Sequence, residues 1–467
     1  MHFDFSSFFD SRRRAAPWDG KAPVRDELFG IERMERHAAS LAAAQPVTDR
    51  PRRVLSLQAR LDDNAAVLLA VYRASAAELE GKRGVTTAAE WLLDNYHLVE
   101  EQIREIRDDL PPGFYRQLPK LAEGPFAGYP RVFGLAWAFV AHTDSHFDLD
   151  TMRRFLVAYQ KVQPLTIGEL WAVAITVRIV LVENLRRLAE QIETGRALRA
   201  QADALAAKLL APGRAQSALD EEKAARPAGD LSERFAAQLA KRLRDQDPLT
   251  TPALGWLEER LAQQGTSIEN AVLHAQQRQG ASNVSVRNVI TSMRLISDID
   301  WAALFESVSL VDEKLCAQSE FAAMDFPTRN LYRSAIEQLA RGSASSEIEI
   351  AELALRAARA AEGTGRAADP GCHLIAEGRA ALEKAVGFRP PARLAISRFN
   401  IRLGIAGYVG AILAVAAILM ALALWSLASE GVAPAWLALL ALLAFLPATD
   451  VATTLSCIRS SAKAPRT

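Results

Sequence analysis

Cysteine is scarce in this chain of 467 residues. The three cysteines, Cys316, Cys372 and Cys457, are far apart, and no Cys-x-x-Cys pair occurs in the sequence. This spacing excludes a disulfide framework and a cysteine-rich zinc site, and it is typical of a protein in a reducing cytoplasm.

An excess of charge of one sign is also absent. Lys plus Arg and Asp plus Glu each total 55, so the formal net charge at pH 7 is zero. We therefore expect no nucleic-acid partner, because proteins that bind nucleic acids carry a basic excess.

The N-terminal segment MHFDFSSFFDSRRR has acids among its aromatic residues and no continuous apolar run, so we expect no secretory signal. The sequence also lacks P-loop, G-x-G-x-x-G, G-x-S-x-G and H-E-x-x-H signatures.

What the chain does contain is long uncharged runs near its C-terminus. Leu403–Ala428 has no charged residue, and at about 1.5 Å per residue it can cross a hydrocarbon core of about 30 Å. Gly431–Thr449 is a second uncharged run, long enough to return. We therefore expect a transmembrane hairpin in residues 401–467, with spans at about 403–428 and 431–455.

Basic residues flank this hairpin, whereas the turn between the runs carries Glu430 as its one charged residue. By the positive-inside rule, both chain termini are expected in the cytoplasm and the turn outside, in a multi-pass protein with the lipid bilayer as a partner. The flanking cations are Lys384, Arg389, Arg393, Arg398 and Arg402 before the first run, and Arg459, Lys463 and Arg466 after the second.

Ahead of the hairpin, apolar residues recur at three- and four-residue steps, the spacing of a helical face. The most apolar of these helices is expected at 167–192, followed by an Ala-rich helical stretch at about 194–223. The stretch 283–299 could alternate as a strand, but its apolar positions also fit a helix, which we favour. The predicted fold class is all-α, a multi-helix cytoplasmic domain followed by a two-span transmembrane hairpin. Composition shifts divide it into a disordered N-terminus (1–22), an N-terminal helical domain (23–225) and a second helical region (226–400).

Several long segments resemble the N-terminal region of bacterial cyclic β-1,2-glucan synthases. They are EWLLDNYHLVEEQIREIRDDLPPGFYRQLPKL (Glu90–Leu121), the run Gly128–Ala189 that begins GYPRVFGLAWAFVAHTDSHF, MDFPTRNLYRSAIEQLAR (Met324–Arg341) and DPGCHLIAEGR (Asp369–Arg379). The resemblance implies a large inner-membrane glucosyltransferase that uses UDP-glucose and a divalent metal. It also implies a phosphorylase-like part that trims the glucan.

The chain ends at Thr467, just after the second run. We therefore expect this chain to lack the family's catalytic domains, with no catalytic residue and no cofactor of its own. Its expected partners are further membrane spans and the glucosyltransferase part of the same system. The alternative interpretation is a membrane-tethered helical scaffold or regulator unrelated to glucan synthesis.

The segment HTDSHFDLD offers possible metal ligands in His142, Asp144 and His146. The competing and favoured interpretation is a polar turn between helices. Asp148 and Asp150 match the acid-x-acid pattern of many glycosyltransferases, as do Asp298 and Asp300. We interpret both pairs as helix caps or solvated turns, because no nucleotide-binding sheet is predicted beside them.

Arg178 interrupts the apolar run AVAITVRIVLV, where an unpaired charge is costly to bury. We expect a buried ion pair with Glu183 or with a carboxylate of a neighbouring helix, the alternative being an anchor for an acidic partner or a phosphate. Arg186 lies on a more polar stretch and is expected to tolerate substitution. Among the aromatic residues, Phe114, Tyr115 and Tyr129 fall in loops, where they could contact a sugar.

Overall fold

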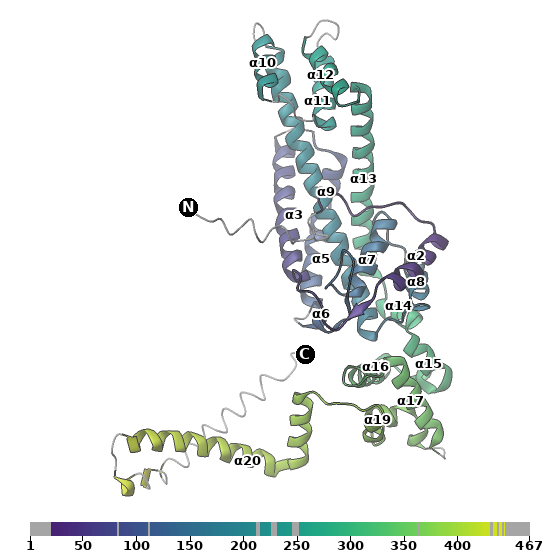
Figure 1. Ribbon diagram of the computed structural model, residues 1–467, viewed down its shortest axis with the longest axis vertical. Coiled ribbons are helices and arrows are strands. Elements are labelled where there is room, and N and C mark those ends of the chain that lie inside the picture. Colours follow the sequence, from purple (N-terminus) through teal and green to yellow (C-terminus); the bar gives the residue numbers. More distant parts are fainter. Residues whose placement is uncertain are drawn as a thin grey trace. The chain divides into compact units, whose positions relative to one another are not determined.

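A computed structural model describes residues 20–81, 84–110, 113–211, 215–225, 231–244, 252–361, 365–429, 433–436, 439–440 and 443 (Figure 1). The chain divides into two compact units, Met1–Asp325 and Phe326–Thr467. The described residues are mostly helical, which confirms the helical fold class. The stretch 283–299, for which a strand was the alternative, lies almost wholly in one long helix, α13.

The first unit is built from helices of very different length. They are α2 (Ile31–Ala44), α3 (Leu57–Glu80), α4 (Thr87–Asp94), α5 (Tyr96–Asp109), α6 (Phe114–Gln117), α7 (Arg131–His142), α8 (Leu149–Gln160), α9 (Ile167–Leu209), α10 (Ala215–Ala225), α11 (Glu233–Arg244), α12 (Pro252–Gln263), α13 (Ile268–Asp298), α14 (Trp301–Val308), α15 (Leu310–Gln318) and the 3₁₀ helix η2 (Glu320–Ala323).

Helix α9 is the axis of this unit, and α3, α5, α7, α11 and α13 all pack against it (Figure 1). It begins with a capping box, in which the Thr166 hydroxyl accepts from the Glu169 amide and the Glu169 carboxylate accepts from the Thr166 amide. Its 43 residues form one helix about 65 Å long. The apolar helix expected at 167–192 and the first part of the Ala-rich stretch are therefore continuous, because nothing at Thr194 or Gly195 interrupts the backbone ladder.

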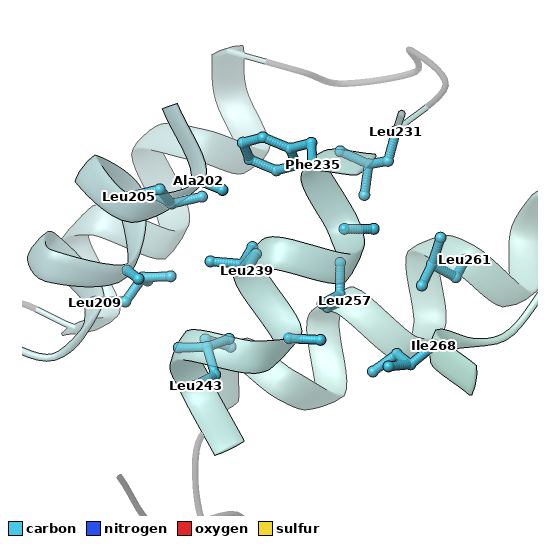
Figure 2. Close-up of a cluster of buried hydrophobic side chains, with 14 of the residues drawn as sticks. Ala202, Leu205, Leu209, Leu231, Phe235, Leu239, Leu243, Leu257, Leu261 and Ile268 are labelled. Atoms are coloured by element: carbon cyan, nitrogen blue, oxygen red, sulfur yellow. The ribbon is translucent and has the colours of Figure 1, made fainter. Parts of the chain in front are cut away.

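A single buried apolar cluster joins both sides of the expected domain limit at residue 226. Helices α9 to α13 contribute to it, and Figure 2 shows side chains of α11 between those of α9 and α12. Its larger members are Leu205, Leu209, Leu219, Leu231, Phe235, Leu239, Leu243, Leu257, Leu261 and Ile268.

Two short strands hold the chain that precedes α7. Strand β1 (Val47–Thr48) pairs antiparallel with β2 (Lys120–Leu121), and Val47 lies opposite Leu121. Gly128 follows with a φ of 89°, and a Cβ there would meet the Arg52 carbonyl oxygen at 2.5 Å. Glycine is therefore required at this turn, which leads from β2 into α7.

In the second unit, α17 packs on both α16 and α18, and α18 packs on α19. Helix α17 begins with a capping box formed by Ser346 and Glu349. The elements of this unit are α16 (Phe326–Arg341), α17 (Glu347–Ala360), the 3₁₀ helix η3 (Arg366–Ala368), α18 (Pro370–Ile375), α19 (Arg379–Ala385) and α20 (Ala392–Ser429).

Helix α20 contains the first expected span. Within it, Ile412–Ser429 is long and apolar enough to cross a membrane by length and composition, and it is the one such helix among the described residues. The second expected span, about 431–455, lies mostly outside the described residues, as do residues 1–19 of the expected disordered N-terminus. The described structure therefore supports one candidate span and leaves the hairpin a prediction.

Candidate functional site

The interior of the first unit contains charged side chains along α9. Glu169 and Glu183 are fully buried, and the side chains of Arg178, Arg186 and Arg187 are almost as well shielded from solvent. A buried charge is tolerated only when it is paired and hydrogen-bonded, so the partners of each group decide what this region can do.

Glu183 is the centre of the largest group, which we call the Glu183 cluster: Arg60, Asn64, Glu183, Arg186 and Arg187. Arg60 donates from Nε (2.9 Å) and Nη2 (3.0 Å), and Asn64 donates from Nδ2 (2.9 Å). Arg186 and Arg187 each donate to the Oε1 atom at 2.8 Å. Burial by itself would raise the pKa of Glu183, but the hydrogen bonds from the three arginines outweigh it and lower the pKa. Glu183 is therefore a fixed anion and not a proton-transferring group.

Arg131 and Glu169 form a second buried pair. Arg131 donates from Nε to Oε1 at 2.9 Å and from Nη2 to Oε2 at 2.6 Å, and it also reaches the Pro164 carbonyl oxygen at 3.0 Å. Burial disfavours the charged guanidinium, yet the two-point bond to Glu169 raises the pKa of Arg131 overall. This pair fixes the start of α7 against the start of α9.

Arg178 lies beside a carboxylate of a neighbouring helix. Its Nη1 atom is 3.2 Å from Oε2 of Glu105 and 3.9 Å from Oδ2 of Asp109, both on α5. Glu183 does not pair with Arg178, because residues five positions apart lie on different faces of a helix. Arg186 and Arg187 lie three and four positions after Glu183, the spacings at which side chains on a helix meet, and they pair with it. Arg186, predicted to lie on a more polar stretch and to tolerate substitution, is 7% exposed and pairs with Glu183 and Glu190.

The segment from α6 to β2 brings a perturbed lysine next to two of the aromatic candidates. The Lys120 ammonium donates to the Tyr115 carbonyl oxygen, and burial lowers the pKa of Lys120 to about 8. The Tyr115 hydroxyl forms a 2.7 Å hydrogen bond with Thr176 of α9, and Phe114 packs edge-on against the Tyr115 ring. Burial raises the pKa of the Tyr115 hydroxyl. Tyr129 is 3% exposed. Phe114 and Tyr115 are partly exposed and remain the aromatic surfaces that a sugar could reach.

Two of the three possible metal ligands, His142 and Asp144, make other contacts. The His142 ring stacks on Phe29 at a centroid distance of 3.9 Å and contacts the Glu27 carbonyl oxygen through Nδ1 at 2.8 Å. Asp144 accepts a 2.5 Å hydrogen bond from Ser285 and is 3.5 Å from Arg25.

His146 is exposed. Across the described residues, no group of three or more His, Cys, Asp or Glu side chains could hold a metal ion. The acid-x-acid pairs act at helix starts, where Asp148 caps α8 and Asp300 caps α14.

With this geometry in view, comparison with known proteins gives one long match. Cyclic beta-(1,2)-glucan synthase NdvB of Rhizobium meliloti (strain 1021) is 40% identical to this chain over 376 residues, which is 79% of the chain. The chain carries an NdvB-like N-terminal region. The match covers 13% of the length of that relative. No family model matches the chain.

The residues that sequence reasoning missed are the partners of the buried charges. Arg60 lies 123 positions before Glu183, and Arg131 lies 38 positions before Glu169. The available signal was charge within apolar helices, which singled out Arg178 but applies equally to Glu169 and Glu183.

Proposed function

We propose that this chain is the membrane-anchored N-terminal part of a cyclic β-1,2-glucan synthase system, in which it docks and positions other parts and performs no chemistry itself. The observation that supports this proposal is the 40% identity to the Rhizobium meliloti synthase over most of the chain. Identity at this level over 376 residues preserves the fold and its packed interior, so the helical unit around α9 would be shared with the synthase.

The geometry of the first unit suits a positioning role. Its buried carboxylates are held by arginines, Glu169 by Arg131 and Glu183 by Arg60, and the hydrogen bonds from arginines lower the pKa of Glu183. The described residues hold no cluster that fits a divalent metal. UDP-glucose and its metal would be bound by the glucosyltransferase part of the system.

Anchoring would come from α20 and the apolar run that follows it. The span at Ile412–Ser429 and the flanking cations support an inner-membrane location with both termini in the cytoplasm. Reporters fused before Asp4 and after Thr467 should both behave as cytoplasmic, and a tag at Gly431 should be reachable from outside. Termini on opposite sides would contradict the hairpin.

A chimera tests the functional proposal. The matching region of the Rhizobium meliloti protein is replaced by this chain, and glucan formed from UDP-glucose is measured in membranes. We expect the chimera to make glucan and a deletion of the same region to make none. A chimera that inserts at the parental level but makes no glucan would favour an unrelated scaffold or regulator. The purified chain alone should transfer no glucose from UDP-glucose, and labelled glucan formed by the chain alone would contradict a purely positioning role.

A further inference from the structure

A cavity of about 540 Å³ lies between α9, α11 and α13, near the start of α4. Its volume is within the range of small-molecule sites. We call it the α9–α11–α13 pocket. Its lining includes Gly195 and Arg199 of α9, Arg234 and Lys241 of α11, and Gln276 and Gln279 of α13.

Helix α11 has two faces, and this explains why the pocket exists. Its apolar face, with Phe235, Leu239 and Leu243, points into the buried cluster shown in Figure 2. Arg234 and Lys241 lie on the opposite side, at a spacing of about two helical turns, and line the pocket. The apolar cluster thus fixes α11 in a rotation that presents cations to the pocket.

Small residues keep the space open. Gly195 faces the pocket from α9, and a Cβ at that position would lie 3.2 Å from Nη1 of Arg234. Glycine within a helix costs about 1 kcal/mol relative to alanine, so its presence in the middle of α9 calls for a packing reason. Ala237 of α11 and Ala275 of α13 line the same space. The Arg234 guanidinium is held in place by donating to the Gln191 carbonyl oxygen at 2.9 Å.

The lining of the pocket contains cations and no acids. None of its described lining residues is Asp or Glu, whereas four are Arg or Lys. Arg244 pairs with Glu269 at 2.9 Å. Among the described residues, neither Arg199 nor Lys241 has a carboxylate within ion-pair distance. The charges of Arg199 and Arg234 lie close enough for Arg199 to help lower the pKa of Arg234. Like charges repel, so an anion bound between them would be stabilising.

A second cavity, of about 550 Å³, extends the positive region. It shares Gln191, Arg234 and Ser282 with the first and adds Lys21 and Arg25 from the N-terminal segment and Arg278 from α13. Burial, together with the nearby charges of Arg278 and Arg199, lowers the pKa of Arg234. Arg25 and Arg278 have acidic partners, Asp144 and Glu233, so Arg199 and Lys241 in the first cavity are the better anion ligands.

We propose that the α9–α11–α13 pocket binds a soluble phosphate ester of small-molecule size. Arg199, Arg234 and Lys241 would hold its phosphate, because clustered cations favour a multiply charged anion. The amide side chains of Gln276, Gln279 and Asn283 line the rest of the pocket and can hydrogen-bond to hydroxyl groups of the ester. A recessed cavity between helices fits such a ligand better than the flat headgroup layer of a membrane. This binding site is independent of the proposed role in glucan synthesis.

The test is calorimetric titration of the full chain in detergent at low salt. The probes are inorganic phosphate, pyrophosphate, glucose 1-phosphate and ADP, with vesicles containing phosphatidylglycerol as a separate arm. The variant Arg199→Gln/Lys241→Gln removes the two cations that lack a partner. The matched control is Lys208→Gln, on the exposed surface of the same helix α9 and outside the pocket. Thermal melting of each variant checks that it is folded.

We expect at least one soluble probe to bind, and the double variant to bind it at least tenfold more weakly, a change of about 1.4 kcal/mol. Lys208→Gln should bind like the parent. The proposal is overturned if no soluble probe binds, if only the vesicles bind, or if a folded double variant keeps the parental affinity.

Discussion

Replacing Glu183 by glutamine removes one negative charge from the Glu183 cluster and little else. Glutamine has nearly the same shape and can still accept a hydrogen bond through its amide oxygen. After the change, the guanidinium groups of Arg60, Arg186 and Arg187 lose the carboxylate that they share. Arg186 keeps Glu190 at 2.8 Å, and Arg187 keeps the Ala22 carbonyl oxygen at 2.8 Å.

The cost follows from burial. Glu183 is fully buried, and the side chains of Arg186 and Arg187 are at most 8% exposed, so water cannot replace the lost charge. Removing one partner of a buried ion pair destabilises a protein by roughly 3 to 5 kcal/mol. For a domain of a few hundred residues, this corresponds to a fall in melting temperature of the order of 10 °C.

Glu190→Gln is the matched control on the same helix. The Glu190 side chain is 34% exposed and pairs with Arg186 at 2.8 Å, at the four-residue spacing. Such a partly exposed pair contributes about 1 kcal/mol or less. The assay is thermal and urea unfolding of the full chain in detergent, followed by circular dichroism. If Glu183→Gln melts together with Glu190→Gln, the cluster is hydrated in solution and the reasoning from burial fails.

Three further changes test other parts of the structure. Arg178→Met should lower the free energy of unfolding in urea at pH 7 by about 1 kcal/mol, because the acidic partners on α5 are partly exposed and can hydrate. A loss of about 3 kcal/mol or more would contradict this. Burial lowers the pKa of Lys120 to about 8 from 10.5, so between pH 8 and 10.5 the unfolded chain holds this proton more tightly than the folded chain. The free energy of unfolding should therefore rise over that pH range relative to Lys120→Met. Parallel curves of unfolding free energy against pH would rule this out. In the second unit, a Cβ at Gly371 would overlap the Tyr332 hydroxyl, so Gly371→Ala should lower the melting temperature. The control is Gly365→Ala, which should leave the melting temperature unchanged because a Cβ there meets nothing within 4 Å. Equal melting temperatures for the two variants would refute the overlap.

The helical fold could be predicted because its signals are local. Periodic apolar residues, caps such as Ser56, Thr86 and Thr166, and proline-rich breaks act within a few residues of one another. The continuity of α9 beyond residue 192 could not be predicted in the same way. Its C-terminal half is Ala-rich with a weak apolar pattern, and its position depends on packing against α11 and α13, which come later in the chain.

The candidate site was predictable only in part, for a related reason. A charge in an apolar helix identifies a residue that needs a partner, and this singled out Arg178. It does not identify the partner, because Glu105 and Arg178 are brought together by the packing of α5 on α9. The α9–α11–α13 pocket was missed altogether, since its cations look like ordinary solvated positions when α11 is read alone.

The two halves of α9 are held by different kinds of packing, and this bears on how the unit could position a partner. Around Glu169 and Glu183, charged pairs with α3 and α7 fix α9 by directional bonds, which tolerate little sliding of one helix along another. From Ala202 to Leu209, α9 packs on α10 and α11 through the buried apolar cluster. Asp203 adds directional bonds to α11, because it accepts from Gln238 at 2.7 Å and pairs with Arg242 at 2.8 Å. The α9–α11–α13 pocket lies between these halves, at Gln191 to Arg199. An anion that bridges the cations of α9 and α11 would therefore act on two helices that Asp203 and the Arg234–Gln191 hydrogen bond already join, so ligand binding would tighten the contact between α9 and α11.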